Sequence, residues 1–208
     1  EDLVARMRDL KLLLELESAM GRAASMEDLV RAALREAIRA TDARLGAVLL
    51  PDEPSQTSLF YLRADSDRLR RVVVNPNDGF LGAILKANKI KTASRRLSIH
   101  ASFEHLTHAE ITSALGAPLD DDPGVLGAIA LFNKRGMSRF QSQDRDIVRL
   151  IAANLSTAVQ LHRSRARQEQ AERLSTIGRL LSGVIHDLKT PMSVISGYAQ
   201  MMAVEDDA

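Results

Sequence analysis

The 208-residue sequence contains no cysteine and no tryptophan, and aromatic residues make up 3% of it. Without cysteine the chain can form no disulfide, no Cys-ligated zinc or iron–sulfur site and no thioether link to a chromophore. So few aromatic side chains also argue against a surface on which nucleic-acid bases stack. The composition fits a reducing compartment, and we expect a cytoplasmic location.

The sequence also lacks an excess of charge of either sign and any long apolar run. Lys and Arg number 28 and Asp and Glu 27, a formal net charge of +1, so no positive field points to nucleic acid. No apolar run approaches the ~18 residues of a membrane span, and Glu1 does not open a secretion signal. A chain that begins with Glu is expected to be a piece of a longer protein. With 45% hydrophobic residues, the length predicts one domain plus additional helices.

Two helices are expected at the N-terminus. The first, within residues 1–22, carries leucine and methionine at 4-3-4 spacing, which is typical of a short coiled-coil or docking helix. Ser25 and Asp28 form a capping box that opens the second helix. The second helix has an apolar stripe wide enough to cover a sheet face. The residues at 4-3-4 spacing on the first helix are Leu3, Met7, Leu10 and Leu14. The apolar stripe of the second helix consists of Met26, Leu29, Val30, Ala33, Leu34, Ala37 and Ile38.

The middle of the chain predicts an α+β domain with helices packed on an antiparallel sheet, because short β-prone runs surround one brief helix. The polar stretch 95–112 predicts a surface loop or short helix, and the acidic run 120–123 a hairpin turn. The expected strands are 45–50, 58–63, 71–75, 90–94, 113–119 and 124–133, and the expected helix is 79–88.

From Ser142 onward the pattern is helical, with two apolar seams that a polar segment, residues 163–173, separates. The second seam does not continue the phase of the first, which indicates a stutter or short break. A continuous helix over 143–203 would be ~90 Å long at ~1.5 Å per residue, so we predict a parallel homodimer along the seam. The first seam is Ile147, Ile151, Leu155, Ala158 and His162; the second is Leu174, Ile177, Leu181, Val184, Leu188, Pro191, Ile195, Tyr198 and Met202.

The segment with the clearest chemistry is GVIHDLKTPMSVISGYAQMM, residues 183–202. Val184 belongs to the seam, and His186 lies about 200° around the helix from it, so His186 faces solvent. A neutral, exposed imidazole can attack phosphorus, and the carboxylate of Asp187 can fix its tautomer. The hydroxyl of Thr190 follows one turn later, and Pro191 removes a helix hydrogen bond and permits a bend.

Residues 174–208 resemble the first helix of the dimerisation and phosphoacceptor region of bacterial two-component histidine kinases. HDLKTP matches that family's H-box, H-E/D-L-x-T/N-P. The resemblance implies that His186 is autophosphorylated, that Asp187 is the activating acid, that Thr190 assists phosphatase chemistry and that Pro191 bends the helix. An isolated exposed histidine would ordinarily have no such role. Here the neighbouring acid, the hydroxyl one turn later and the proline occur together with a histidine on the solvent-facing side of the helix.

Residues 23–160 resemble a GAF domain, a ligand-sensing module common upstream of such kinases. The closing run SALGAPLDDDPGVLGAIALFNKRG and the central run GFLGAILKANKIKTAS carry this resemblance. It implies a GAF-like antiparallel sheet flanked by helices, with an N-terminal helix and a long C-terminal coiled-coil helix. We therefore divide the chain into 1–22, a docking helix; 23–160, the GAF-like domain; 161–176, a helical signalling linker; and 177–208, the first phosphoacceptor helix.

The ligand of this domain stays open at this point. Asn133, Lys134, Phe140 and Asp144 match most of an NK…F…DE motif of cyclic-nucleotide-binding members, but Arg145 replaces the final Glu, and the lysine–acid pair is interpreted as structural. A bilin would need a cysteine. Gly79 and Gly82 lack the context of a phosphate loop and are interpreted as turn and packing residues.

Three histidines and an aromatic residue in the 95–112 stretch are the remaining candidates for ligand binding. They are His100, Phe103, His105 and His108. A histidine here could be an axial haem ligand or contribute to zinc binding, but a polar surface loop is the simpler interpretation of these residues. We predict no metal site.

The sequence therefore predicts the sensory and phosphoacceptor part of a histidine kinase, with a response-regulator receiver domain as partner and a small molecule or protein as signal. No second bundle helix and no ATP-binding domain precede Ala208, so we expect these residues alone to be inactive, with ATP and Mg²⁺ used by a domain outside them. The alternative is a non-enzymatic module that binds a ligand, such as a cyclic nucleotide, and dimerises.

Overall fold

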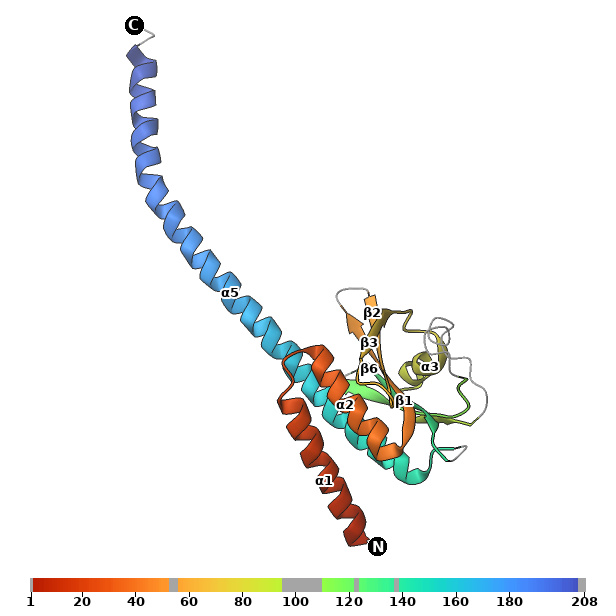
Figure 1. Ribbon diagram of the computed structural model, residues 1–208. Helices are drawn as coiled ribbons and strands as arrows, with labels where there is room; N and C mark the ends of the chain where they lie inside the picture. The colour runs from red at the N-terminus through yellow and green to blue at the C-terminus, as the bar shows by residue number, and fades with distance from the viewer. Residues whose placement is uncertain (1, 53–55, 95–109, 122–123, 137–138, 206–208) are drawn as a thin grey trace. The chain divides into compact units, whose positions relative to one another are not determined.

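The computed structural model describes residues 2–52, 56–94, 110–121, 124–136 and 139–205 (Figure 1). The chain divides into two compact units, Glu1–Leu161 and His162–Ala208. Its elements in order are α1 (Asp2–Gly21), α2 (Met26–Thr41), β1 (Ala43–Asp52), β2 (Gln56–Arg63), β3 (Arg70–Val73), α3 (Gly79–Ala87), β4 (Lys91–Ala93), β5 (Ala114–Asp121), β6 (Gly124–Lys134) and α5 (Ser142–Glu205).

Helix α2 begins and ends as its sequence predicts. The Oγ of Ser25 accepts a hydrogen bond from the backbone N–H of Asp28 at 3.1 Å, which confirms the capping box. The helix ends at Thr41, and the left-handed backbone of the next residue, Asp42 (φ 54°), lets its N–H reach the carbonyl of Ile38. The predicted apolar stripe is buried, except for the half-buried Met26.

The six strands form one sheet in the order β3-β2-β1-β6-β5-β4, and all neighbouring pairs are antiparallel. This arrangement confirms the predicted α+β fold, and each expected strand is present with ends shifted by a few residues. The pairing of β5 with β6 changes register between Leu119 and Asp120. This irregularity was not predicted, because an apolar run does not reveal a local register shift.

The two faces of the sheet have different cores. One core joins the sheet to α2, to the C-terminal half of α1 and to the first turns of α5. The other packs α3 against the opposite face, where the rings of Phe80 and Phe132 meet edge to face with centroids 6.2 Å apart. Gly79 has φ 68°, and a Cβ on Gly82 would collide with the backbone of Asn77. Their interpretation as turn and packing glycines is confirmed.

Helix α1 has two apolar faces with different surroundings. Leu12, Leu16 and Met20 are buried in the first core. Met7, Leu10 and Leu14, three of the four residues of the predicted docking stripe, are exposed.

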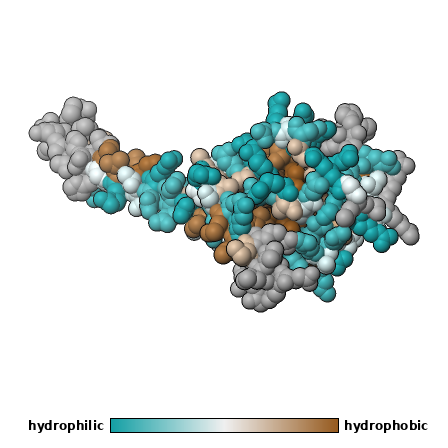
Figure 2. Space-filling model, turned by 60° about the horizontal axis from the view of Figure 1, so that its bottom comes forward, coloured by the Kyte–Doolittle hydropathy of each residue, from teal (hydrophilic) through white to brown (hydrophobic). Residues whose placement is uncertain are grey.

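The part of α5 after Leu161 belongs to the second unit. Its apolar side chains are exposed wherever the structure describes them, and Figure 2 shows them as a brown strip beside teal polar residues. Among the described helices, none combines the length and the hydropathy that a bilayer crossing requires.

Candidate functional site

The predicted phosphoacceptor segment lies within α5. The helical assignment runs through residues 183–202 and ends at Glu205. The side chains of His186, Asp187, Thr190 and Pro191 lie outside the described residues, so their roles stay predictions. Because the segment is helical, position 186 lies about 200° around the helix axis from position 184.

The predicted ligand-binding residues of the GAF-like domain are not described by the structure. His100, Phe103, His105 and His108 fall in 95–109, outside the described residues. Within the described part of the chain, no three His, Asp or Glu side chains are grouped as a metal site.

The lysine–acid pair of the NK…F…DE motif is an internal ion pair. The Nζ of Lys134 lies 2.6 Å from both carboxylate oxygens of Asp144, and the backbone N–H of Gln141 donates to the same carboxylate at 2.6 Å. Asp144 is buried, and the pair joins the end of β6 to the start of α5. The geometry supports the structural interpretation, because the carboxylate is occupied by partners from this chain. Arg145 is exposed and donates to Thr92 at 3.5 Å.

Asn133 holds the end of β6 to the segment before β5. Its backbone is left-handed (φ 56°), and its side-chain oxygen accepts from the N–H of Thr112 at 2.9 Å. Its side-chain amide donates to the carbonyl of Glu110 at 2.8 Å. Asparagine tolerates the left-handed region better than most residues, so one residue supplies both the turn and the cross-link.

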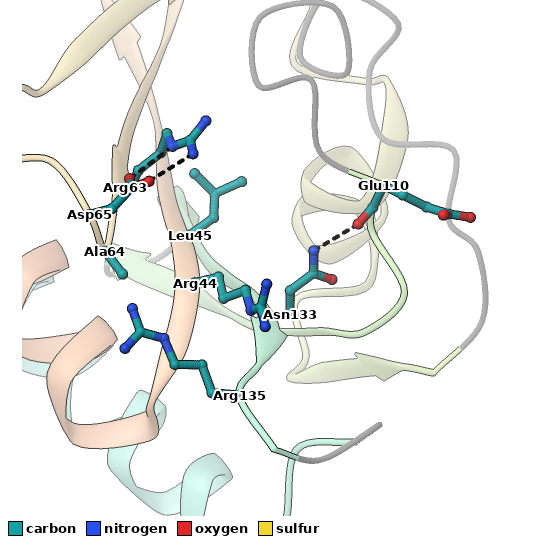
Figure 3. A pocket seen from close by; sticks show the side chains of 8 residues that line it. All are labelled: Arg44, Leu45, Arg63, Ala64, Asp65, Glu110, Asn133 and Arg135. Carbon is teal, nitrogen blue, oxygen red and sulfur yellow. Dashed lines mark hydrogen bonds and ion pairs between the residues drawn. The ribbon is translucent and has the colours of Figure 1, made fainter.

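A pocket of about 500 Å³ opens at this end of the sheet (Figure 3). It is lined by Arg44 and Leu45 of β1, residues 63–65 at the end of β2, Glu110, Asn133 and Arg135. Three arginines from three different strand ends therefore surround one opening.

These arginines were not among the predicted site residues. Arg44 precedes the apolar run of β1, Arg63 closes β2 and Arg135 follows β6. A basic residue at each of three strand ends was the available signal. Only the register shows that these ends meet, because Leu45 pairs with Arg63 on one side and with Phe132 on the other.

The arginines differ in how far their charge is already neutralised. Arg63 makes two hydrogen bonds to Asp65, at 3.0 and 2.8 Å, and these lower the pKa of the Asp65 carboxyl; the charges of Arg63 and, more weakly, Arg135 act in the same direction. Arg135 lies 3.9 Å from the carboxylate of Asp42, at the limit of an ion pair. Among the described residues, none forms an ion pair or side-chain hydrogen bond with Arg44.

Comparison with known proteins identifies the family. The family model for the GAF domain matches residues 23–160. The fold is similar to the GAF domain of a phosphoenolpyruvate-protein phosphotransferase from Coxiella burnetii, with a TM-score of 0.61 and 16% identity over 77% of this chain and 98% of that one. It is also similar to the chromophore-binding domain of a Stigmatella aurantiaca bacteriophytochrome, with a TM-score of 0.55 and 13% identity over 73% of this chain and 60% of that one.

A short stretch has a curated relative. It is 47% identical over 36 residues to the signal transduction histidine-protein kinase AtoS of Escherichia coli (strain K12). The match spans 17% of this chain and 6% of that protein's length. The family match covers more than half of the chain and agrees with the sheet order and helices described above. The chain therefore belongs to the GAF domain family.

Proposed function

We propose that this chain is the sensory and phosphoacceptor part of a two-component histidine kinase, in which His186 carries the phosphoryl group. The observation that supports this most strongly is the HDLKTP motif on a helix whose apolar side chains after Leu161 are exposed wherever the structure describes them. The 36-residue similarity to a histidine-protein kinase points the same way.

The apolar face of the second unit calls for further helices. Leu174, Ile177, Leu181 and Val184 keep the 3-4 spacing of a helix–helix seam, and each is more than half exposed. Leu180 and Ile185, which flank the seam, are exposed as well. Positions beside a two-stranded seam are usually charged, so an apolar face of this width fits a bundle of more than two helices.

The proposed chemistry follows from the phase of the helix. With the seam covered by a second copy, His186 faces away from the packed side, where an ATP-binding domain or a receiver domain can reach it. The carboxylate of Asp187 accepts the proton of one imidazole nitrogen while the other attacks the γ-phosphorus of ATP. A bond forms between nitrogen and the γ-phosphorus as the bond from that phosphorus to the β,γ-bridging oxygen breaks, and ADP leaves. Pro191 has no N–H for the carbonyl of Asp187, which loosens the helix directly after the histidine.

The GAF unit supplies the regulation in this proposal. A ligand or partner that favours one state of the domain shifts the phase of the helix across 163–173, and that shift changes how His186 is presented. The partners are a second copy of the chain and the receiver domain of a response regulator.

The test is phosphorylation by an ATP-binding kinase domain, either fused to the chain or added in trans, with ATP labelled on its γ-phosphate. The account predicts acid-labile, alkali-stable label in the wild type, none in His186→Gln and full label in the matched control His162→Gln, on the same helix. Label retained in His186→Gln would overturn the site. The competing function, a GAF module that only binds a ligand and dimerises, predicts no transfer from any phosphorylated form to a receiver domain.

A further inference from the structure

We propose that the pocket at the sheet end, framed by Arg44, Arg63 and Arg135, binds a small organic anion through its carboxylate or phosphate oxygens. The proposal rests on the proposed function in one respect, because it takes the GAF unit as the part that receives the signal. It adds the place and the chemical class of that signal.

The walls of the pocket are held by backbone hydrogen bonds. The N–H of Ala64 donates to the carbonyl of Arg44 at 2.9 Å, so β2 and β1 stay paired at the opening. The N–H of Arg135 donates to the carbonyl of Asp42 at 2.9 Å, and that of Asn133 to the carbonyl of Ser113 at the same distance. The Cα atoms of the arginines are thus fixed, and only their side chains need to adjust to a ligand.

The charge inside the pocket is unbalanced toward positive. Asp65 is occupied by Arg63, and the side chain of Glu110 extends away from the three arginines in Figure 3. Arg135 lies 3.9 Å from the carboxylate of Asp42, and its charge also acts weakly on Asp65. Arg44 has no ion pair among the described residues. Two guanidinium groups therefore face the opening with little or no neutralisation.

An adjoining hollow does not compete for the same ligand. It has a volume of about 280 Å³ and shares Arg63, Ala64 and Arg135 with the pocket. Its own arginines are already paired: Arg35 with Asp67 at 2.9 Å, and Arg39 with Glu15 and Glu36. An incoming anion would have to displace these carboxylates, whereas at Arg44 it displaces only water.

The residues that line the pocket also indicate that the anion is an organic molecule with a carboxylate or phosphate group. A guanidinium presents parallel N–H donors that match the two oxygens of a carboxylate or phosphate. The half-buried Ala64 adds apolar surface beside the arginines, and the buried Leu45 forms part of the same wall. An organic ligand covers such a surface and a bare inorganic ion does not. A volume of about 500 Å³ is in the range of small-molecule sites.

The test is titration calorimetry of the 208-residue chain with two probes, succinate for a dicarboxylate and glycerol 3-phosphate for a phosphate monoester, with inorganic phosphate as reference. All titrations are made at equal ionic strength, because exposed charges are screened by salt. The inference predicts saturable binding of one organic probe, tighter than that of inorganic phosphate, and the probe that binds decides between the two oxyanions.

Variants locate the binding. Arg44→Gln is expected to weaken the affinity for the probe that binds at least tenfold. The matched control Arg70→Gln, which changes an exposed arginine on β3, is expected to leave this affinity unchanged. Unaltered circular dichroism and urea midpoints show that both variants fold. Absence of saturable binding, or equal binding by Arg44→Gln and wild type, would overturn the inference. The proposed function fails on a different readout, the labelling of His186, so either can fail while the other stands.

Discussion

Helix α5 offers two stretches of the same residue types in different surroundings. In the first unit Ile151 and Leu155 are fully buried, in the core that α2 and the sheet complete. In the second unit Leu174 and Val184 are 62% and 55% exposed. The two stretches are similar in composition and spacing, so the difference lies in what covers them.

This comparison shows where each unit obtains its stability. The first unit buries two cores of its own, one on each face of the sheet. In the second unit the described apolar side chains of the helix are exposed, and single helices are marginal in water because most helical stability in proteins comes from packing. We infer that the second unit is completed by other chains.

The largest expected effect separates the two stretches directly. Leu155→Ala should lower the free energy of unfolding by about 2–5 kcal/mol, because it leaves a cavity in a packed core. Leu181→Ala, measured where the chain is monomeric, should change it by less than about 0.5 kcal/mol, as for an exposed position. The measurement is urea unfolding followed by the fluorescence of the buried Tyr61, in a Tyr198→Phe background. Equal losses in the two variants would contradict the comparison.

The next effect concerns the ion pair where α5 joins the sheet. Lys134→Met leaves the buried carboxylate of Asp144 without its cation and should cost about 2–4 kcal/mol, somewhat less than for a fully buried pair. The double variant Lys134→Met/Asp144→Asn should recover part of this loss, because no uncompensated charge remains. A double variant as unstable as the single one would show that the charge is not what matters.

A smaller effect is expected at Asn133, which closes the same end of the sheet. Asn133→Ala loses both the hydrogen bonds and the tolerance of a left-handed backbone, whereas Asn133→Gly loses only the hydrogen bonds. The Asn133→Ala variant should therefore be less stable than the Asn133→Gly variant by about 1 kcal/mol. The stability of the two variants is compared by thermal unfolding. A glycine variant less stable than the alanine variant would contradict a role for the left-handed backbone.

An effect of similar size tests the start of α2. Ser25→Ala should cost about 1 kcal/mol as the loss of an N-cap. The hydrogen bond from Ser25 is the largest cause of the lowered pKa of Asp28, so the variant should raise that pKa toward its ordinary value. A lowered carboxyl pKa stabilises the fold above the unfolded-state pKa, and this contribution is lost as the pH falls through the folded-state pKa. Carbon NMR titration of Asp28 checks the direction; an unchanged pKa would contradict it.

Much of the first unit could be predicted because its signals are local. The capping box at Ser25, the stripe on α2 and the apolar runs of β1 and β6 each follow from residues close in sequence. The pocket could not be predicted, because Arg44, Arg63 and Arg135 meet only through strand register. The ion pair between Lys134 and Asp144 was anticipated from a motif, but its burial depends on how β6 meets α5.

The measurement that tests the account most directly is the oligomeric state of the chain in solution. Sedimentation equilibrium should give a dimer for the wild type and for Arg179→Asp, and a monomer for Leu181→Asp, because position 181 lies on the seam and position 179 does not. A monomeric wild type would contradict the account. So would a dimer that persists in Leu181→Asp and is lost in Leu10→Asp, since the interface would then lie on α1 and the apolar face of the second unit would remain uncovered.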